Sequence, residues 1–250
     1  TGATMLRLLL AAGLWACAAG ALAQQNAPPT PTRDIYMIYV QVMGNLDAAH
    51  PRVAARAGRN DEVISFPLAY RRTGVLLEDV RFPGAWTTFV RAGAHGYYAG
   101  EFGSNPALPR AGRGMWCFTE EPGDETPATR CVLQQNGDSW IAGSLPSNPY
   151  LPVSVGVYQG ARGTTPPNVE ERSVAIHPDL RAGYTFSYSR IDAFYLQLRV
   201  GGRPIAPAHY LRIARETDGS GYLETPAGVI RLTPHQGRRG VNIQLIAPSI

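Results

Sequence analysis

Short apolar runs separated by glycine or proline follow one another from residue 62 to residue 246. Runs of roughly four to eight residues rich in Val, Ile, Tyr and Phe are typical of β-strands. The period is clearest over residues 194–200, where Phe194, Leu196 and Leu198 share one face while Tyr195 and Gln197 share the other. The runs that we interpret as strands are 63–70, 75–82, 86–91, 96–102, 115–118, 131–133, 153–159, 172–176, 184–189, 193–200, 210–216, 222–224, 229–232 and 241–246.

This pattern predicts an all-β fold with little helix. Consecutive short strands joined by turns favour antiparallel pairing in a sandwich-like architecture, with one large or two small β domains. Residues 34–43 are dense in β-branched and aromatic side chains, and we predict the first strand there. Over residues 45–59, Pro51 suits a first helical turn and Gly58 a stop, which predicts a short surface helix.

A disulfide hairpin is predicted between Met115 and Trp140. Two apolar runs, each holding one cysteine, flank an acidic loop with proline and glycine. We therefore expect Cys117 and Cys131 to pair across two adjacent strands. The following Asn136-Gly137-Asp138 favours a type I′ turn into the next strand.

The N-terminal residues have the three parts of an export signal. Arg7 supplies the positive charge, residues 8–19 the apolar segment, and Ala21-Leu22-Ala23 the small-x-small cleavage site. We interpret residues 1–23 as a signal peptide, with residues 1–4 upstream of the true start at Met5. An alternative is a lipid anchor at Cys17, because residues 14–17 resemble the lipidation motif of bacterial lipoproteins. Either alternative predicts an exported protein in the periplasm or outside the cell, where the two remaining cysteines favour a disulfide.

The rest of the chain divides at stretches rich in proline. Residues 24–33 hold three prolines and predict an extended linker. Residues 144–152 hold three more, which predicts a connection between an N-terminal β region (34–143) and a C-terminal β region (153–250). The same stretch also fits a long crossover within one sandwich. No apolar stretch after Ala23 reaches the length of a transmembrane helix, so we expect no such segment in the mature chain.

Charge adds little to this picture. The 23 basic residues are all arginine, which could serve anion recognition, but the abundance of Ala, Gly and Pro favours a genome rich in G and C as the explanation. The net charge of +4 would fall to +3 on loss of Arg7 with the signal. Because the arginines are scattered rather than gathered in one run, we expect no nucleic-acid partner.

Residues for catalysis or metal binding are sparse. The five histidines are isolated and lack metal-ligand spacing, so we assign no metal, cofactor or catalytic residue. Gly137-Asp138-Ser139 resembles the start of the Gly-Asp-Ser block of a lipase and esterase family, but no Asp-x-x-His follows to supply a base, which favours a turn. If the protein is a hydrolase instead, His95, Glu101 and Asp138 are the first candidates.

A ligand surface is a further hypothesis. Tyr97, Tyr98, Glu101 and Trp140 lie near predicted loops, and exposed rings favour contact with a sugar or an apolar partner. Trp116, next to Cys117, is instead expected in the core. The residues Gly96–Phe102, Trp116-Cys117, Cys131 and Gly137-Asp138 together resemble a segment of uncharacterised exported proteobacterial proteins.

The sequence therefore predicts an exported envelope protein that acts as a non-catalytic binding or structural β module. Its expected partner is another envelope protein or a glycan. The alternatives are an envelope hydrolase whose site is assembled from loops, and a surface protein held in the membrane through Cys17.

Overall fold

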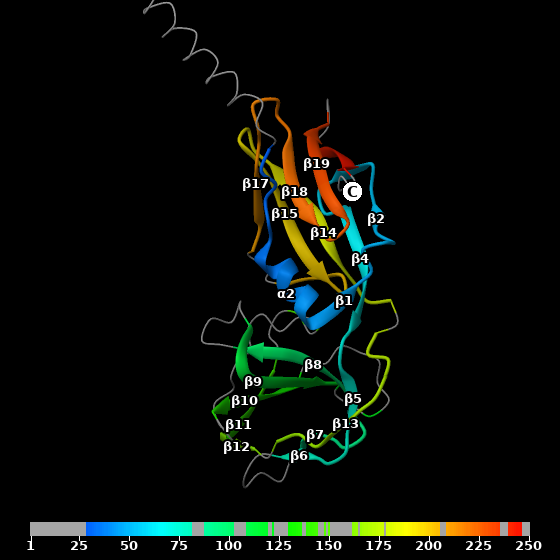
Figure 1. Ribbon diagram of the computed structural model, residues 1–250, viewed down its shortest axis with the longest axis vertical. Helices are drawn as coiled ribbons and strands as arrows, with labels where there is room; N and C mark the ends of the chain where they lie inside the picture. Colours follow the sequence, from blue (N-terminus) through cyan, green and yellow to red (C-terminus); the bar gives the residue numbers. More distant parts are fainter. Residues whose placement is uncertain are drawn as a thin grey trace, which may run out of the picture. The chain divides into compact units, whose positions relative to one another are not determined.

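Antiparallel β-sheets make up most of the computed structural model (Figure 1). The all-β, sandwich-like prediction is confirmed. Residues Thr32–Ile250 form one compact unit. The structure describes residues 29–81, 88–102, 109–119, 122, 130–136, 139–144, 148, 150, 162–164, 166–177, 179–205, 209–235 and 240–246.

The first sheet is built around three long strands, β4, β14 and β15. Its order is β1-β4-β14-β15-β16, with β2 also paired to β4 and β17 also paired to β15. Strand β14 approaches β4 closely at Gly183, where an added Cβ would lie 2.2 Å from the carbonyl oxygen of Ile64. The strands are β1 (Gly44–Leu46), β2 (Arg52–Val53), β4 (Glu62–Tyr70), β14 (Arg181–Ser189), β15 (Ala193–Val200), β16 (Arg203–Pro204) and β17 (Leu211–Ala214).

The second sheet contains the disulfide, and we call it the disulfide sheet. Its order is β12-β11-β10-β9-β8-β5-β13, and all neighbouring strands in it are antiparallel. A separate two-stranded sheet pairs β6 with β7. These strands are β5 (Thr73–Leu76), β6 (Val80–Arg81), β7 (Thr88–Val90), β8 (His95–Phe102), β9 (Pro109–Phe118), β10 (Arg130–Asn136), β11 (Ser139–Ser144), β12 (Arg162–Thr164) and β13 (Val169–Glu171).

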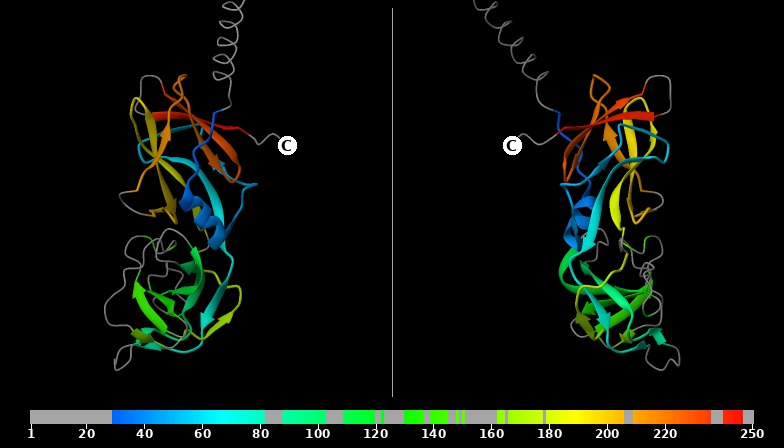
Figure 2. Two further views of the ribbon diagram at one scale, coloured as in Figure 1. Left: turned by 60° about the vertical axis from the view of Figure 1, so that its left-hand side comes forward. Right: turned by 90° about the vertical axis from the view of Figure 1, so that its right-hand side faces the viewer.

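The last sheet packs against the first. Its order is β18-β19-β20-β3, and both views of Figure 2 show its strands beside those of the first sheet. Its residues Leu223, Ile230 and Leu232 belong to the same core as Phe186 and Phe194 of the first sheet. This shared core is the sandwich that the alternating pattern predicts. The strands are β3 (Arg56–Gly58), β18 (Gly221–Thr225), β19 (Gly228–Pro234) and β20 (Gly240–Ile246).

Sheets combine strands from both sides of the proline-rich residues 144–152. In the first sheet β4 pairs with β14, and in the disulfide sheet β5 pairs with β13. The division at 144–152 stays a prediction, and most of those residues lie outside the described ones. The predicted strand over 153–159 also lies outside them.

The cysteine pairing is confirmed. Cys117 on β9 and Cys131 on β10 are register partners and form a disulfide that spans 14 positions of the sequence. Tyr97 on β8 is the next partner across the same face. The neighbouring row of Tyr98, Trp116 and Val132 must therefore face the other way.

Both faces of the disulfide sheet are covered by apolar side chains. The face with Tyr97 and the disulfide belongs to the large core, whereas Trp116, Phe118 and Val132 belong to a smaller second core. Strands β6 and β7 contribute Val80 and Val90 to that second core. Trp116 is buried as expected, on the face opposite the disulfide.

The strand predicted over residues 34–43 is wrong, because this segment forms helix α2 (Ile35–Met43). The Asp34 carboxylate accepts a hydrogen bond from the backbone N–H of Tyr36 at 2.9 Å, which caps the first turn. Met37, Val40 and Met43 recur at helical spacing and are buried. Because nearly every position of this run is apolar, the sequence shows no alternation of apolar and polar residues that would distinguish a helix from a strand.

The short helix predicted over residues 45–59 is also wrong, since strands β1, β2 and β3 occupy this stretch. Asp47 accepts hydrogen bonds from the backbone N–H groups of Ala49 and His50, which forms a turn between β1 and β2. The partner of β3, β20, is remote in sequence, and β1 and β2 are only three and two residues long, so local propensity does not reveal these strands. The strand predicted over 172–176 is displaced as well, because β13 covers Val169–Glu171 and no strand covers 172–177.

Candidate functional site

The residues predicted as a ligand surface do not share one surface. Tyr97 is fully buried, and its ring stacks on Tyr70 with centroids 4.0 Å apart. Burial raises the pKa of the Tyr97 hydroxyl far above its ordinary range. Its neighbour Tyr98 lies on the opposite face of β8. No single ligand can therefore contact both rings from one side of the sheet.

Tyr98 is half-buried among other side chains. Its ring meets Trp116 edge to face at 5.6 Å, and the guanidinium carbon of Arg72 lies 4.1 Å from its centroid. Arg72 is also bound by Glu171, whose pKa it lowers by hydrogen bonding and charge. The exposed area of Tyr98 is thus reduced by an ordered cation–π contact.

For Glu101 and Trp140 the structure describes the position of the backbone only. Glu101 on β8 pairs with Gly114, and Trp140 on β11 pairs with Gln134 and Thr164. Their side chains lie outside the described ones, and the hypothesis that they contact a ligand stays a prediction.

The residues suggested for a hydrolase are not brought together in the described part of the chain. His95 begins β8, where its ring Nδ1 lies 3.3 Å from the carbonyl oxygen of Ala175. Asp138 lies outside the described residues, as does the side chain of Glu101. Among described residues no group of three or more His, Cys, Asp or Glu side chains could hold a metal ion.

A surface that the sequence did not predict lies on the outer face of β14, β15 and β17. Tyr188, Tyr195 and Arg212 are register partners across the three strands and form one row. The rings of Tyr188 and Tyr195 stack with centroids 4.4 Å apart, and Tyr210 meets Tyr188 edge to face at 5.8 Å. With Arg190, these residues make up what we call the tyrosine–arginine surface.

A β-bulge creates this row. Phe186 pairs with Leu196, but Tyr188 pairs with Tyr195, so Ser187 is the extra residue on β14. Strict alternation would have pointed Tyr188 inward with Tyr184 and Phe186. After the bulge it points outward, where 38% of it is exposed. Bulges of this kind often re-aim a side chain next to a functional site.

Arginine and aspartate side chains lie beside the stacked rings of Tyr188 and Tyr195. The guanidinium carbon of Arg190 lies 5.6 Å from the centroid of Tyr195 and 5.9 Å from that of Tyr188. Arg212 donates to Asp192 at 2.7 Å, and this hydrogen bond lowers the pKa of the Asp192 carboxyl. The hydrogen bond that Arg212 donates to Asp192, followed by its hydrogen bond with Tyr195, raises the pKa of the Arg212 guanidinium. These contacts hold the two guanidinium groups beside the aromatic rings.

The hairpin between β14 and β15 ends in an exposed apolar side chain. Ile191 is 96% exposed and lies between Arg190 and Asp192. The backbone N–H of Arg190 donates to the carbonyl oxygen of Ala193, which closes the turn. An apolar residue at a turn between two predicted strands was the one sign of this surface in the sequence.

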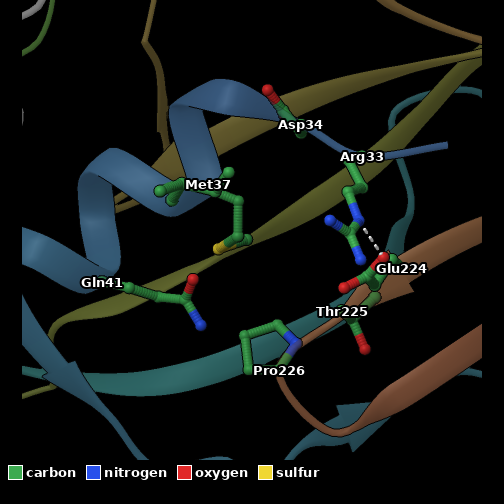
Figure 3. A pocket seen from close by; sticks show the side chains of 8 residues that line it. Arg33, Asp34, Met37, Gln41, Glu224, Thr225 and Pro226 are labelled. Atoms are coloured by element: carbon green, nitrogen blue, oxygen red, sulfur yellow. Dashed lines mark hydrogen bonds and ion pairs between the residues drawn. The ribbon is translucent and has the colours of Figure 1, made fainter. Parts of the chain in front are cut away.

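A pocket of about 320 Å³ lies between α2 and the turn joining β18 to β19 (Figure 3). The guanidinium of Arg33 crosses it to bind the Glu224 carboxylate, and Gln41 and Pro226 line the opposite end. Asp34 borders the pocket, and its burial raises the pKa of the carboxyl. That carboxylate caps α2 and accepts a hydrogen bond from the Tyr184 hydroxyl at 3.0 Å. The pocket's two acidic groups therefore have structural partners.

Neither the search for membrane-spanning helices nor the comparison with known proteins assigns a role to the tyrosine–arginine surface. No helix in the described part of the chain is long and apolar enough to cross a membrane. Comparison with protein families, curated proteins and solved structures finds no match to this chain. The site must therefore be interpreted from its own residues.

Proposed function

We propose that this protein is an exported bacterial envelope protein that acts as a non-catalytic binding module through its tyrosine–arginine surface. The proposed partner is another envelope protein or a glycan. Export is supported by the three-part N-terminal signal and by the disulfide, which suits an oxidising compartment. The cleaved, soluble form is proposed ahead of a form anchored through Cys17.

The observation that carries the proposal is the bulge that places Tyr188 beside Tyr195 on an outer face. Tyrosine and arginine, with tryptophan, are enriched among the residues that dominate binding energy at interfaces. Tyrosine buries a large area at low entropic cost, and arginine donates several hydrogen bonds from one planar group. Here the rings are already stacked and held by Arg190. Binding would therefore require little ordering of these side chains.

Site-specific photo-crosslinking tests the proposal. A photoreactive phenylalanine analogue at Ile191 should form one defined adduct in cells that export the protein, and protease or glycosidase digestion should identify it as protein or glycan. The double variant Tyr188→Ala and Arg190→Ala should reduce the adduct about tenfold or more.

The control places the same analogue at Leu77, which is 49% exposed and lies next to β5 of the disulfide sheet. An adduct of equal yield from both positions would show unspecific contact. No adduct from position 191 in exported protein would also overturn the proposal.

A further inference from the structure

One side of helix α2 carries an apolar stripe. Ile35, Ile38 and Val42, at spacings of three and four residues, are 44%, 52% and 49% exposed. The opposite side of the helix is buried in the core through Met37 and Val40. Helix α2 has no charged residue, and Gln41, which is half-buried and lines the pocket beside Ile38, is its one amide or charged side chain.

Guanidinium groups lie at both ends of this stripe. Arg33 immediately precedes the Asp34 cap, and 73% of its side chain is exposed. Arg71 donates from Nη2 to the backbone carbonyl of Gln41 at 2.9 Å, which places its charge at the C-terminal end of α2. Arg33 is paired with Glu224, but such an exposed ion pair is weak and a phosphate group can compete with it.

We propose that this side of α2 is a membrane-contacting surface, with the stripe against the acyl boundary and Arg33 and Arg71 against anionic lipid headgroups. Surface helices that bind membranes combine an apolar side with flanking basic residues. Each basic residue near an anionic surface adds to binding, and the effect is screened by salt. Here the flanking charges come from Arg33 and Arg71 outside the helix, since α2 itself contains no charged residue.

A second copy of the chain fits the stripe less well. Stable dimers bury about 800 Å² on each partner, and three half-exposed aliphatic side chains offer far less. A bilayer needs no complementary shape and can accept a small apolar stripe together with cations. The inference is independent of the tyrosine–arginine surface, which lies on other elements.

Vesicle co-sedimentation tests this inference on the protein in the form that cells export. Binding should be clear with phosphatidylglycerol in phosphatidylcholine vesicles, weak with phosphatidylcholine alone, and reduced by salt. Ile38→Ser should weaken binding about tenfold, because it removes apolar area from the centre of the stripe. Arg71→Gln should weaken it about threefold, and Glu224→Gln should strengthen it by releasing Arg33.

The matched control is Leu77→Ser, because Leu77 is as exposed as Ile38 but does not belong to α2. Thermal unfolding of each variant checks that the fold is kept. No binding to anionic vesicles, equal binding to both vesicle types, or equal binding by Ile38→Ser would overturn the proposal. A concentration-dependent dimer that Ile38→Ser abolishes would show that the stripe binds a second copy instead.

Discussion

The disulfide sheet and the β14–β15 hairpin both contain many aromatic residues, but they use them differently. In the disulfide sheet, Tyr97 lies in the large core, while Tyr98 and Trp116 pack on the second core. In the hairpin, Phe194 faces the core and its neighbour Tyr195 faces outward. One region has both faces covered, and the other leaves one face open.

The difference shows why aromatic content alone does not locate a binding surface. A ring contributes to recognition only if its face of the sheet is uncovered in the folded chain. Strands β6 and β7 add residues to the second core and help cover the disulfide sheet. On β14 the bulge at Ser187 moves Tyr188 away from the core. Which aromatic rings are exposed therefore depends on which sheet faces are covered by other strands and on the strand register around the bulge.

The largest expected difference in stability is between substitutions on the core-facing and outer-facing sides of β15. Phe194→Ala should lower the free energy of unfolding by about 3 to 5 kcal/mol, because it leaves a cavity in the large core. Tyr195→Ala, one residue further along, should cost only about 1 kcal/mol, because its half-buried ring lies on the outer face and loses mainly its stacking contact with Tyr188. Urea unfolding followed by fluorescence measures both values. Similar losses for the two variants would contradict the assignment of an open and a covered face.

A smaller effect should come from the disulfide. Replacing both Cys117 and Cys131 by alanine should lower the free energy of unfolding by about 3 kcal/mol, since the bond limits the unfolded chain. The photo-crosslink from position 191 should persist in this variant under conditions where it stays folded, because the tyrosine–arginine surface lies on the outer face of β14, β15 and β17 and contains neither cysteine. Loss of the crosslink from a folded variant would show that the two regions depend on each other. Wild-type protein unfolded with reductant serves as the control.

The sequence was sufficient where local pattern and tertiary structure agree. Strict alternation located β15 at Ala193–Val200, and two apolar runs around a turn-rich loop located the Cys117–Cys131 pairing. The pattern failed at residues 35–43, where an unbroken apolar run hid the helical period. It also could not locate the candidate surface, because a bulge depends on the register with the partner strand. Residues 188 and 195 become neighbours only in the folded sheet.

Asp34 provides the smallest and most specific test, since its carboxylate joins α2 to β14 through the Tyr184 hydroxyl. Asp34→Ala should lower the free energy of unfolding by about 1 to 3 kcal/mol, because the helix loses its cap and a buried hydroxyl loses its acceptor. Asp34→Asn keeps an acceptor for the Tyr36 N–H and should be close to wild type at neutral pH. Urea unfolding of the three proteins at a series of pH values measures the effect.

The pH dependence of this pair has a definite sign. Burial raises the folded-state pKa of Asp34 above its ordinary value of 3.8, so between the two values the native protein holds the proton more tightly than the unfolded chain. The stability of wild type relative to Asp34→Asn should therefore increase as the pH falls through the folded pKa and level off below 3.8. A relative stability that falls over this range would mean that the ionised carboxylate is favoured in the fold. Asp34 would then act through its charge at the start of α2 rather than as a buried hydrogen-bond acceptor.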